Sequence, residues 1–226
     1  MKLKKIQLSR FCVQIIYLAL IIIGLFMKIR PLLGIIFIGA FLFGNFFCGW
    51  LCPFGSIQDF FARIGSIFIK KKYKMPNSIQ KYLKFSRYFI AIGILIAFGK
   101  ERINNPVDSY HAFFSFIRGK EITTLSLLIM ISLVIISMFF ERPFCNYFCA
   151  EGIRYGVASF TRLFTIKRNK ETCIDCKKCN KVCPMNIEIA EKNHVRSAQC
   201  INCFNCISSC PKEGALKYTF FKKIKK

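Results

Sequence analysis

Two runs of four cysteines near the C-terminus constrain this chain more than any other feature. Each run has the spacing C-x2-C-x2-C-x3-C and is followed by proline. In order, the eight residues are Cys173, Cys176, Cys179, Cys183, Cys200, Cys203, Cys206 and Cys210. Two-residue gaps let three sulfurs face inward from one tight loop, which suits a [4Fe–4S] cluster. Paired structural zinc also uses C-x2-C spacing, but it leaves the third cysteine of each run and both prolines unexplained.

The segment resembles a bacterial-type two-cluster ferredoxin domain across residues 170–217. The resemblance implies a small α+β fold that transfers single electrons and has no catalytic acid, base or nucleophile. It also implies that the fourth thiolate of each cluster comes from the other run. The implied ligands are then Cys173, Cys176, Cys179 and Cys210 for one cluster, and Cys200, Cys203, Cys206 and Cys183 for the other. Because so small a domain builds little core, the clusters should supply much of its folding energy.

The N-terminal part of the chain is strongly apolar, and 54% of all residues are hydrophobic. About 20 apolar residues are needed to span a bilayer. Apolar runs that approach this length occupy residues 11–27, 32–50, 85–98 and 122–140. The sequence therefore predicts an all-α four-helix transmembrane domain over residues 1–165 and an α+β ferredoxin-like domain over residues 166–226.

The distribution of charge predicts the orientation of these four spans. The 35 Lys and Arg outnumber the 11 Asp and Glu, giving a formal charge of +24. Residues 1–10 carry four Lys and Arg and residues 51–84 carry seven, whereas residues 28–31, between the first and second runs, carry only two. Cytoplasmic loops are enriched in this way, so both termini should lie in the cytoplasm and the protein in the cytoplasmic membrane. No recognition motif accompanies the charge, which favours the lipid bilayer over nucleic acid as a partner.

A second cysteine pattern follows the second and fourth apolar runs. Cys48 and Cys52 lie in FFCGWLCPFGS, and Cys145 and Cys149 lie in RPFCNYFCAEG. A shift of 97 residues aligns the two C-x3-C pairs, which indicates an internal repeat. A four-residue gap places both sulfurs of a pair on one helical face. The pairs could be small apolar residues at helix ends, could bind iron or a third cluster, or could be redox-active dithiols.

Together these motifs resemble the membrane-bound polyferredoxin family, which includes the NapH-type quinol dehydrogenase component. The resemblance implies an electron-transfer subunit, rather than a stand-alone enzyme, between the quinone pool or a cytoplasmic donor and a partner redox enzyme. Quinol could lose protons near Asp108 and His111, although an ordinary interfacial histidine is the simpler interpretation. Ala150 stands where the first repeat has Pro53, so the two copies differ.

Two other functions fit the same motifs. One is an assembly factor that reduces a metal or disulfide during maturation of a partner metalloenzyme. The other is a ferredoxin that is merely tethered to the membrane. The basic residues of the C-terminal domain, with the tail KKIKK at residues 222–226, predict docking to anionic lipid headgroups or to an acidic donor protein.

Overall fold

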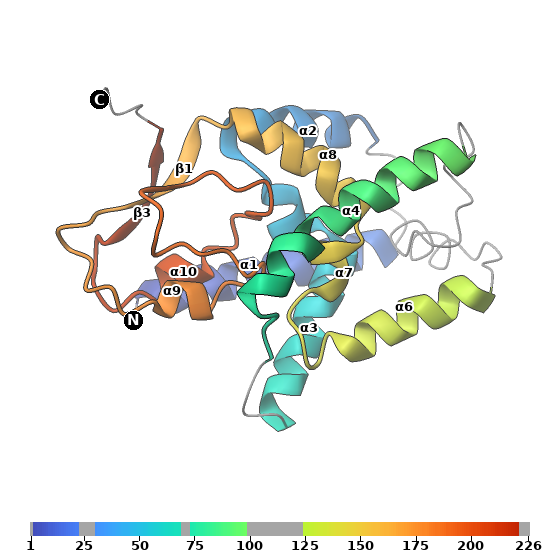
Figure 1. The fold of residues 1–226 in the computed structure, drawn as a ribbon, viewed down its shortest axis with the longest axis horizontal. Helices are drawn as coiled ribbons and strands as arrows, with labels where there is room; N and C mark the ends of the chain where they lie inside the picture. The colour runs from blue at the N-terminus through green and yellow to red at the C-terminus, as the bar shows by residue number, and fades with distance from the viewer. Residues whose placement is uncertain (1, 23–29, 69–72, 99–123, 222–226) are drawn as a thin grey trace. The chain divides into compact units, whose positions relative to one another are not determined.

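The computed structural model describes residues 2–22, 30–68, 73–98 and 124–221 (Figure 1). Two compact units emerge from the described contacts. The first unit combines residues 1–52 with residues 154–226, and the second unit is residues 53–153. Asp108, His111 and the KKIKK tail lie outside the described residues.

The first unit joins the N-terminal helices to the cysteine runs. Helix α1 (Lys2–Ile22) is followed by α2 (Arg30–Phe43) and by the π-helical turn η2 (Phe47–Leu51). Helix α8 (Ala150–Ala158) crosses the boundary between the units, and its C-terminal half, from Arg154 on, belongs to the first unit. It continues into the 3-10 turn η4 (Ser159–Thr161). Helix α1 packs against both η2 and the short helix α10 (Asn205–Ser208).

A three-stranded antiparallel sheet frames the cysteine runs. Strand β1 (Phe164–Arg168) is central, between β2 (His194–Val195) and β3 (Leu216–Phe220). Strand β1 precedes the first run, β2 lies between the runs, and β3 follows the second run. Helix α9 (Lys178–Lys181), within the first run, packs against α10 (Figure 1). This part of the chain is α+β, as the resemblance to ferredoxins implies.

The second unit is helical in its described residues. It contains α3 (Pro53–Phe68), α4 (Asn77–Phe98), α6 (Thr124–Ile136) and α7 (Pro143–Tyr147). The guanidinium of Arg142, fully buried, donates two hydrogen bonds to the carboxylate of Asp59, at 2.7 and 2.6 Å. This ion pair ties the start of α7 to α3. Such buried guanidinium–carboxylate pairs are costly to break, because one charge is left without its partner.

The prediction of a four-helix transmembrane domain in the cytoplasmic membrane is wrong. Among the described residues, no helix is both long enough and apolar enough to cross a membrane. Helices α2 and α6 have 14 and 13 residues, fewer than the about 20 that a span needs. Helices α1 and α4 are longer, but Arg10 and Arg87 interrupt their apolar character. The predicted orientation, with four spans and cytoplasmic termini, rested on those spans and falls with them.

The second predicted span, residues 32–50, also breaks in the middle. Helix α2 ends at Phe43, and Gly44 adopts a positive φ of 82°. Glycine tolerates this left-handed conformation without steric cost, so the chain turns here and then begins η2. The apolar run is therefore two short elements.

Candidate metal centre

The two cysteine runs adopt the same backbone conformation. A shift of 27 residues places α9 on α10, and each helix follows a residue with positive φ, Lys177 (52°) or Phe204 (56°). Two residues earlier, Asp175 (50°) and Asn202 (48°) also have positive φ. The two runs are therefore a structural repeat.

The repeated conformation suits an anionic iron–sulfur group. Alternation between right-handed and left-handed residues turns successive backbone N–H groups toward one concavity, which binds anions such as phosphate or the sulfides of a cluster. Left-handed conformations are uncommon for residues other than glycine. Their occurrence at matched positions of both runs fits loops that wrap around a bound group.

The structure brings together the thiols of the second predicted ligand set. Burial raises the pKa of the Cys183 thiol to about 12, and the charges of nearby Cys203 and Cys200 add to this effect. Burial also raises the pKa of Cys206, with further contributions from Cys203, Cys200 and Cys183. Cys183 comes from the first run, so thiols from both runs are neighbours. Thiols with raised pKa hold their protons at neutral pH and must release them when a metal binds.

Three thiols of the first predicted set are also neighbours. Burial raises the pKa of Cys179, and the charges of Cys173 and Cys176 act on it in the same direction. Cys210, the fourth predicted ligand, lies just after α10, where its thiol donates a hydrogen bond of 3.3 Å to the Lys212 carbonyl oxygen. No described contact brings Cys210 to the other three thiols, so its assignment stays a prediction.

The described side chains do not converge on a single ion. Within the described ranges, no group of three or more His, Cys, Asp or Glu side chains could hold one metal ion. A cubane makes a different demand, because each of its four thiolates binds a different iron. The wrapped loops and the neighbouring thiols thus fit such a cluster.

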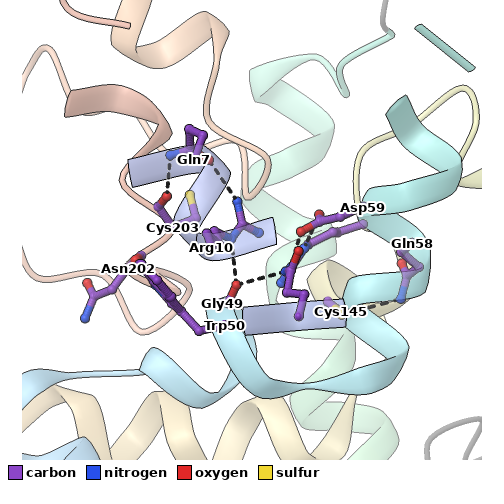
Figure 2. A network of polar contacts seen from close by, with 11 residues as sticks. Gln7, Arg10, Gly49, Trp50, Gln58, Asp59, Cys145, Asn202 and Cys203 are labelled. Carbon is purple, nitrogen blue, oxygen red and sulfur yellow. Dashed lines mark hydrogen bonds and ion pairs between the residues drawn. The ribbon is translucent and has the colours of Figure 1, made fainter. Parts of the chain in front are cut away.

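The N-terminal elements hold the second loop from outside. The Gln7 amide on α1 donates to the Cys203 carbonyl oxygen at 3.0 Å, and the Trp50 indole N–H donates to the Asn202 carbonyl oxygen at 3.0 Å (Figure 2). The Asn202 side chain in turn donates to the Phe43 carbonyl oxygen at 2.7 Å. Backbone groups of the second loop are therefore fixed by contacts from distant parts of the sequence.

Among the residues that contact the second loop, Gly49 leaves no room for a side chain. A methyl group on Gly49 would lie 2.0 Å from the Ile201 carbonyl oxygen, so only glycine fits at this position. The Gly49 carbonyl oxygen accepts hydrogen bonds from Arg10 at 2.7 Å and from Gln14 at 3.3 Å, both on α1 (Figure 2). Gly49 and Trp50 lie between Cys48 and Cys52. The first C-x3-C pair is therefore packed directly against the second cysteine loop.

Replacing Trp50 by Phe should loosen this contact while keeping most of its apolar area. The carbonyl oxygen of Asn202 would lose its donor, at a cost of about 1 kcal/mol. We expect the midpoint of thermal unfolding, measured on protein with iron and sulfide bound, to fall by a few degrees. Phe46→Leu is the matched control, because Phe46 packs on Phe204 at 5.6 Å between ring centroids but donates no side-chain hydrogen bond. An equal fall for both variants would show that ring packing, and not the indole N–H, fixes the loop.

The two C-x3-C pairs share a main-chain feature. The amide of Cys52 donates to the Phe47 carbonyl oxygen at 2.8 Å, and the amide of Cys149 donates to the Phe144 carbonyl oxygen at 3.0 Å. These are the wide, five-residue bonds of a π-helical turn, which often mark functional sites. Their occurrence at positions related by 97 residues supports the internal repeat.

The pairs differ from the prediction in one respect. Neither pair lies within one continuous α-helix, because η2 ends at Leu51 and α7 ends at Tyr147. Cys52 and Cys149 instead immediately precede α3 and α8. Pro53 is the first residue of α3, a position at which proline is favoured.

Both sulfurs of the second pair accept hydrogen bonds within the second unit. The fully buried Gln58 amide donates to the Cys145 sulfur at 3.5 Å (Figure 2). The Gly152 amide donates to the Cys149 sulfur at 3.3 Å. Both sulfurs are buried, so these hydrogen bonds supply polar partners that would stabilise a thiolate if a metal bound there. In the first pair, the buried Tyr17 lies close enough to Cys52 for the two groups to interact electrostatically.

Sequence reasoning missed the residues that hold the second loop, namely Gln7, Gly49, Trp50 and Asn202. One signal was available. The second run and its approach, residues 197–210, contain no charged residue, whereas the first run contains Asp175, Lys177, Lys178 and Lys181. A loop free of charge is the one suited to burial.

Comparisons with known proteins find two iron–sulfur families that together match most of the chain. A family of 4Fe–4S binding domains matches residues 32–76 and 122–163, and a family of 4Fe–4S dicluster domains matches residues 165–211. The first match contains both C-x3-C pairs, and the second contains both cysteine runs. No solved structure matches the chain.

Three curated relatives extend over most of the chain. The uncharacterised protein MJ0750 of Methanocaldococcus jannaschii is 33% identical over 84% of this chain and 79% of its own length. YccM of Escherichia coli K12, named provisionally as an electron transport protein, is 31% identical over 78% of this chain. The ferredoxin-type protein NapH of Haemophilus influenzae is 28% identical over 76% of this chain and 61% of its own length. The chain spans about half the length of YccM, since the match covers 51% of that relative.

Two 4Fe–4S binding domains and these relatives define an iron–sulfur protein of the ferredoxin type. The chain belongs to a polyferredoxin-like family, as the resemblance of its cysteine motifs predicted.

Proposed function

We propose that this protein is a one-electron relay between a donor and a partner redox enzyme, with two [4Fe–4S] clusters held by the cysteine runs. Cys173, Cys176, Cys179 and Cys210 would hold one cluster, and Cys200, Cys203, Cys206 and Cys183 the other. When bound, these clusters supply reversible one-electron transfer. The observation that carries the proposal is the repeated left-handed loop conformation around neighbouring thiols from both runs.

The protein's own residues would position and shield the two centres differently. Gln7, Gly49 and Trp50 cover the backbone of the second loop and keep water from it. The first loop has no such cover among its described neighbours, and Cys176 is exposed to solvent. The quinol that the resemblance implies as an electron source stays a prediction, and the relay does not depend on it.

An anaerobic redox titration followed by electron paramagnetic resonance tests the relay. We expect two reducible centres in the wild-type protein. Cys210→Ser should perturb the same signal as Cys173→Ser, and Cys183→Ser the same signal as Cys200→Ser, because each residue completes the ligand set of the opposite run. If Cys183→Ser instead altered the same signal as Cys173→Ser, the crossed ligand sets would be incorrect. If the protein showed no reducible centre, the relay itself would be excluded.

We further propose that the C-x3-C pairs handle electrons, either as redox dithiols or as ligands of additional iron. The hydrogen bonds that the Cys145 and Cys149 sulfurs accept support this proposal, because such bonds would stabilise a thiolate that binds a metal or reacts. The same chemistry would suit the maturation of a partner metalloenzyme, in which a dithiol reduces a metal or a disulfide.

Changing Cys48, Cys52, Cys145 and Cys149 to Ser together separates these roles. If the pairs bind iron, the iron content should fall to about eight atoms per chain, the content of two cubanes. If they are dithiols, iron should stay the same while the number of thiols that alkylate after reduction falls by four. Retention of full electron-transfer activity in the variant would contradict both roles. A need for the thiols only once per partner molecule, and not in each turnover, would favour maturation.

A further inference from the structure

The two cysteine loops have the same backbone conformation, but the first is exposed to solvent and the second is buried. In the second loop, Ile201, Asn202 and Cys203 are buried. In the first loop, Ile174 is 56% exposed, and Asp175 and Cys176 are also exposed. Since the backbones match, the side chains and their neighbours must account for the difference.

Each charged residue of the first run has a neutral counterpart in the second. Under the 27-residue shift, Asp175, Lys177, Lys178 and Lys181 correspond to Asn202, Phe204, Asn205 and Ser208. Three of these neutral residues make the contacts that bury the second loop. Asn202 donates to the Phe43 carbonyl oxygen, the Phe204 ring packs on Tyr218 at 5.2 Å, and the Ser208 hydroxyl accepts from Gln7 at 3.2 Å.

The lysines of the first run are not needed to neutralise a cluster. The second run has the same cysteine spacing and loop conformation without a single charge. Lys177, Lys178 and Lys181 are all exposed. The carboxylate of Asp175 is paired with Arg168 at 3.1 Å, so the local excess of positive charge remains.

We propose that the first loop is the docking surface for an acidic electron-transfer protein. This surface, the first-loop face, comprises Ile174, Cys176, Lys177, Lys178 and Lys181. It combines an exposed apolar side chain and an exposed cysteine with a basic rim, the composition of transient protein interfaces. Redox encounters bury little area and depend on complementary charge for their rate. A protein fits better than an anionic lipid surface, because the exposed Cys176, a proposed ligand of the first cluster, would bring that cluster within reach of a redox partner.

This inference rests on the proposed relay, and it separates the two loops by role. The first loop would exchange electrons with the partner. The second loop, enclosed by α1 and by the segment between Cys48 and Cys52, would exchange electrons only within the protein.

The test uses the loaded full-length protein, reduced anaerobically and reoxidised in a stopped-flow instrument by two small probes. One probe is the anion cobalt(III)–EDTA, and the other is the cation hexaamminecobalt(III). The test variant carries Lys177→Gln with Lys178→Gln. The control carries Lys192→Gln with Lys217→Gln, which removes the same charge from exposed positions outside both runs. Iron content verifies that each variant remains loaded.

We expect the test variant to react with the anion about two- to tenfold more slowly than wild type at low ionic strength, and with the cation faster. The control should match wild type, and added salt should remove the difference. Equal rates for the two variants would overturn the inference. A second arm measures sedimentation with phosphatidylglycerol–phosphatidylcholine vesicles. If the test variant lost vesicle binding but kept its rate with the anion, the lysines would serve a lipid surface and the inference would also fail.

Failure of the relay would look different. If wild-type protein held no reducible centre, the proposed function would fail. If the centre were present and the two variants reacted alike, only the docking surface would be excluded.

Discussion

Removing the clusters under anaerobic conditions should unfold the ferredoxin-like segment, residues 164–220. Its helices α9 and α10 have four residues each, and β2 has two. Helices this short are not stable alone, so ligand binding must supply the missing free energy. We expect amide hydrogen exchange in β1 and β3 to accelerate at least about a hundredfold, equivalent to about 3 kcal/mol of local stability.

Mass spectrometry of the exchanged peptides measures this change, with α3 and α4 as internal references. These helices belong to the second unit, which excludes both cysteine runs. Restoring iron and sulfide should restore protection in the strands. Unchanged exchange in β1 and β3 after complete removal of iron would mean that the protein scaffold alone holds the loops.

Gly49→Ala should disturb the second cysteine loop although it changes no cysteine. The added methyl group would lie 2.0 Å from the Ile201 carbonyl oxygen and 3.2 Å from its carbon, so backbone must move. Overpacking of this kind costs about 1–3 kcal/mol, and occasionally more. We expect a lower thermal midpoint and a changed resonance signal from the centre that contains Cys200, Cys203 and Cys206. The other centre should keep its wild-type signal.

Gly39→Ala is the matched control for this prediction. Gly39 lies in α2 of the same unit, and a methyl group there would have no neighbouring atom within 4 Å. Alanine is also the better helix former, by about 1 kcal/mol. The control should therefore be as stable as wild type or more so. If Gly49→Ala behaved like Gly39→Ala, the close contact between the C-x3-C segment and the second loop would be incorrect.

The cysteine patterns could be interpreted from sequence because ligand spacing is a local property. Three cysteines separated by two-residue gaps must share one loop, whatever the rest of the fold does. The same reasoning found the 97-residue repeat, which the matched bonds at Cys52 and Cys149 support. It could not reveal how Cys210 is placed, since that depends on the packing of α10 against α9.

The spans were mispredicted because apolar content was counted without the side chains that interrupt it. Arg10 and Gln14 lie on α1, and both are buried where they bond to the Gly49 carbonyl oxygen. A hydropathy average over the segment stays high despite one or two polar residues. It therefore does not reveal that a buried guanidinium binds a specific carbonyl group inside the protein. Gly44 likewise ends α2 after too few residues for a span, and its left-handed conformation is a property of the folded chain.

The contact between the first C-x3-C pair and the second cysteine loop lay beyond sequence reasoning for another reason. Gly49 and Ile201 are far apart in the chain, and no local pattern predicts which glycine meets which carbonyl group. In retrospect, the neutral second run pointed to burial. What covers it, namely Gln7, Trp50 and Gly49, required the tertiary structure.

The most direct test of the central claim is the content of iron and acid-labile sulfide in anaerobically purified wild-type protein, with Mössbauer spectroscopy of the same sample. Two cubanes predict about eight sulfides per chain, at least about eight iron atoms, and the spectrum of [4Fe–4S] centres. About two zinc atoms per chain, without sulfide, would identify the cysteine runs as structural zinc sites and contradict the account.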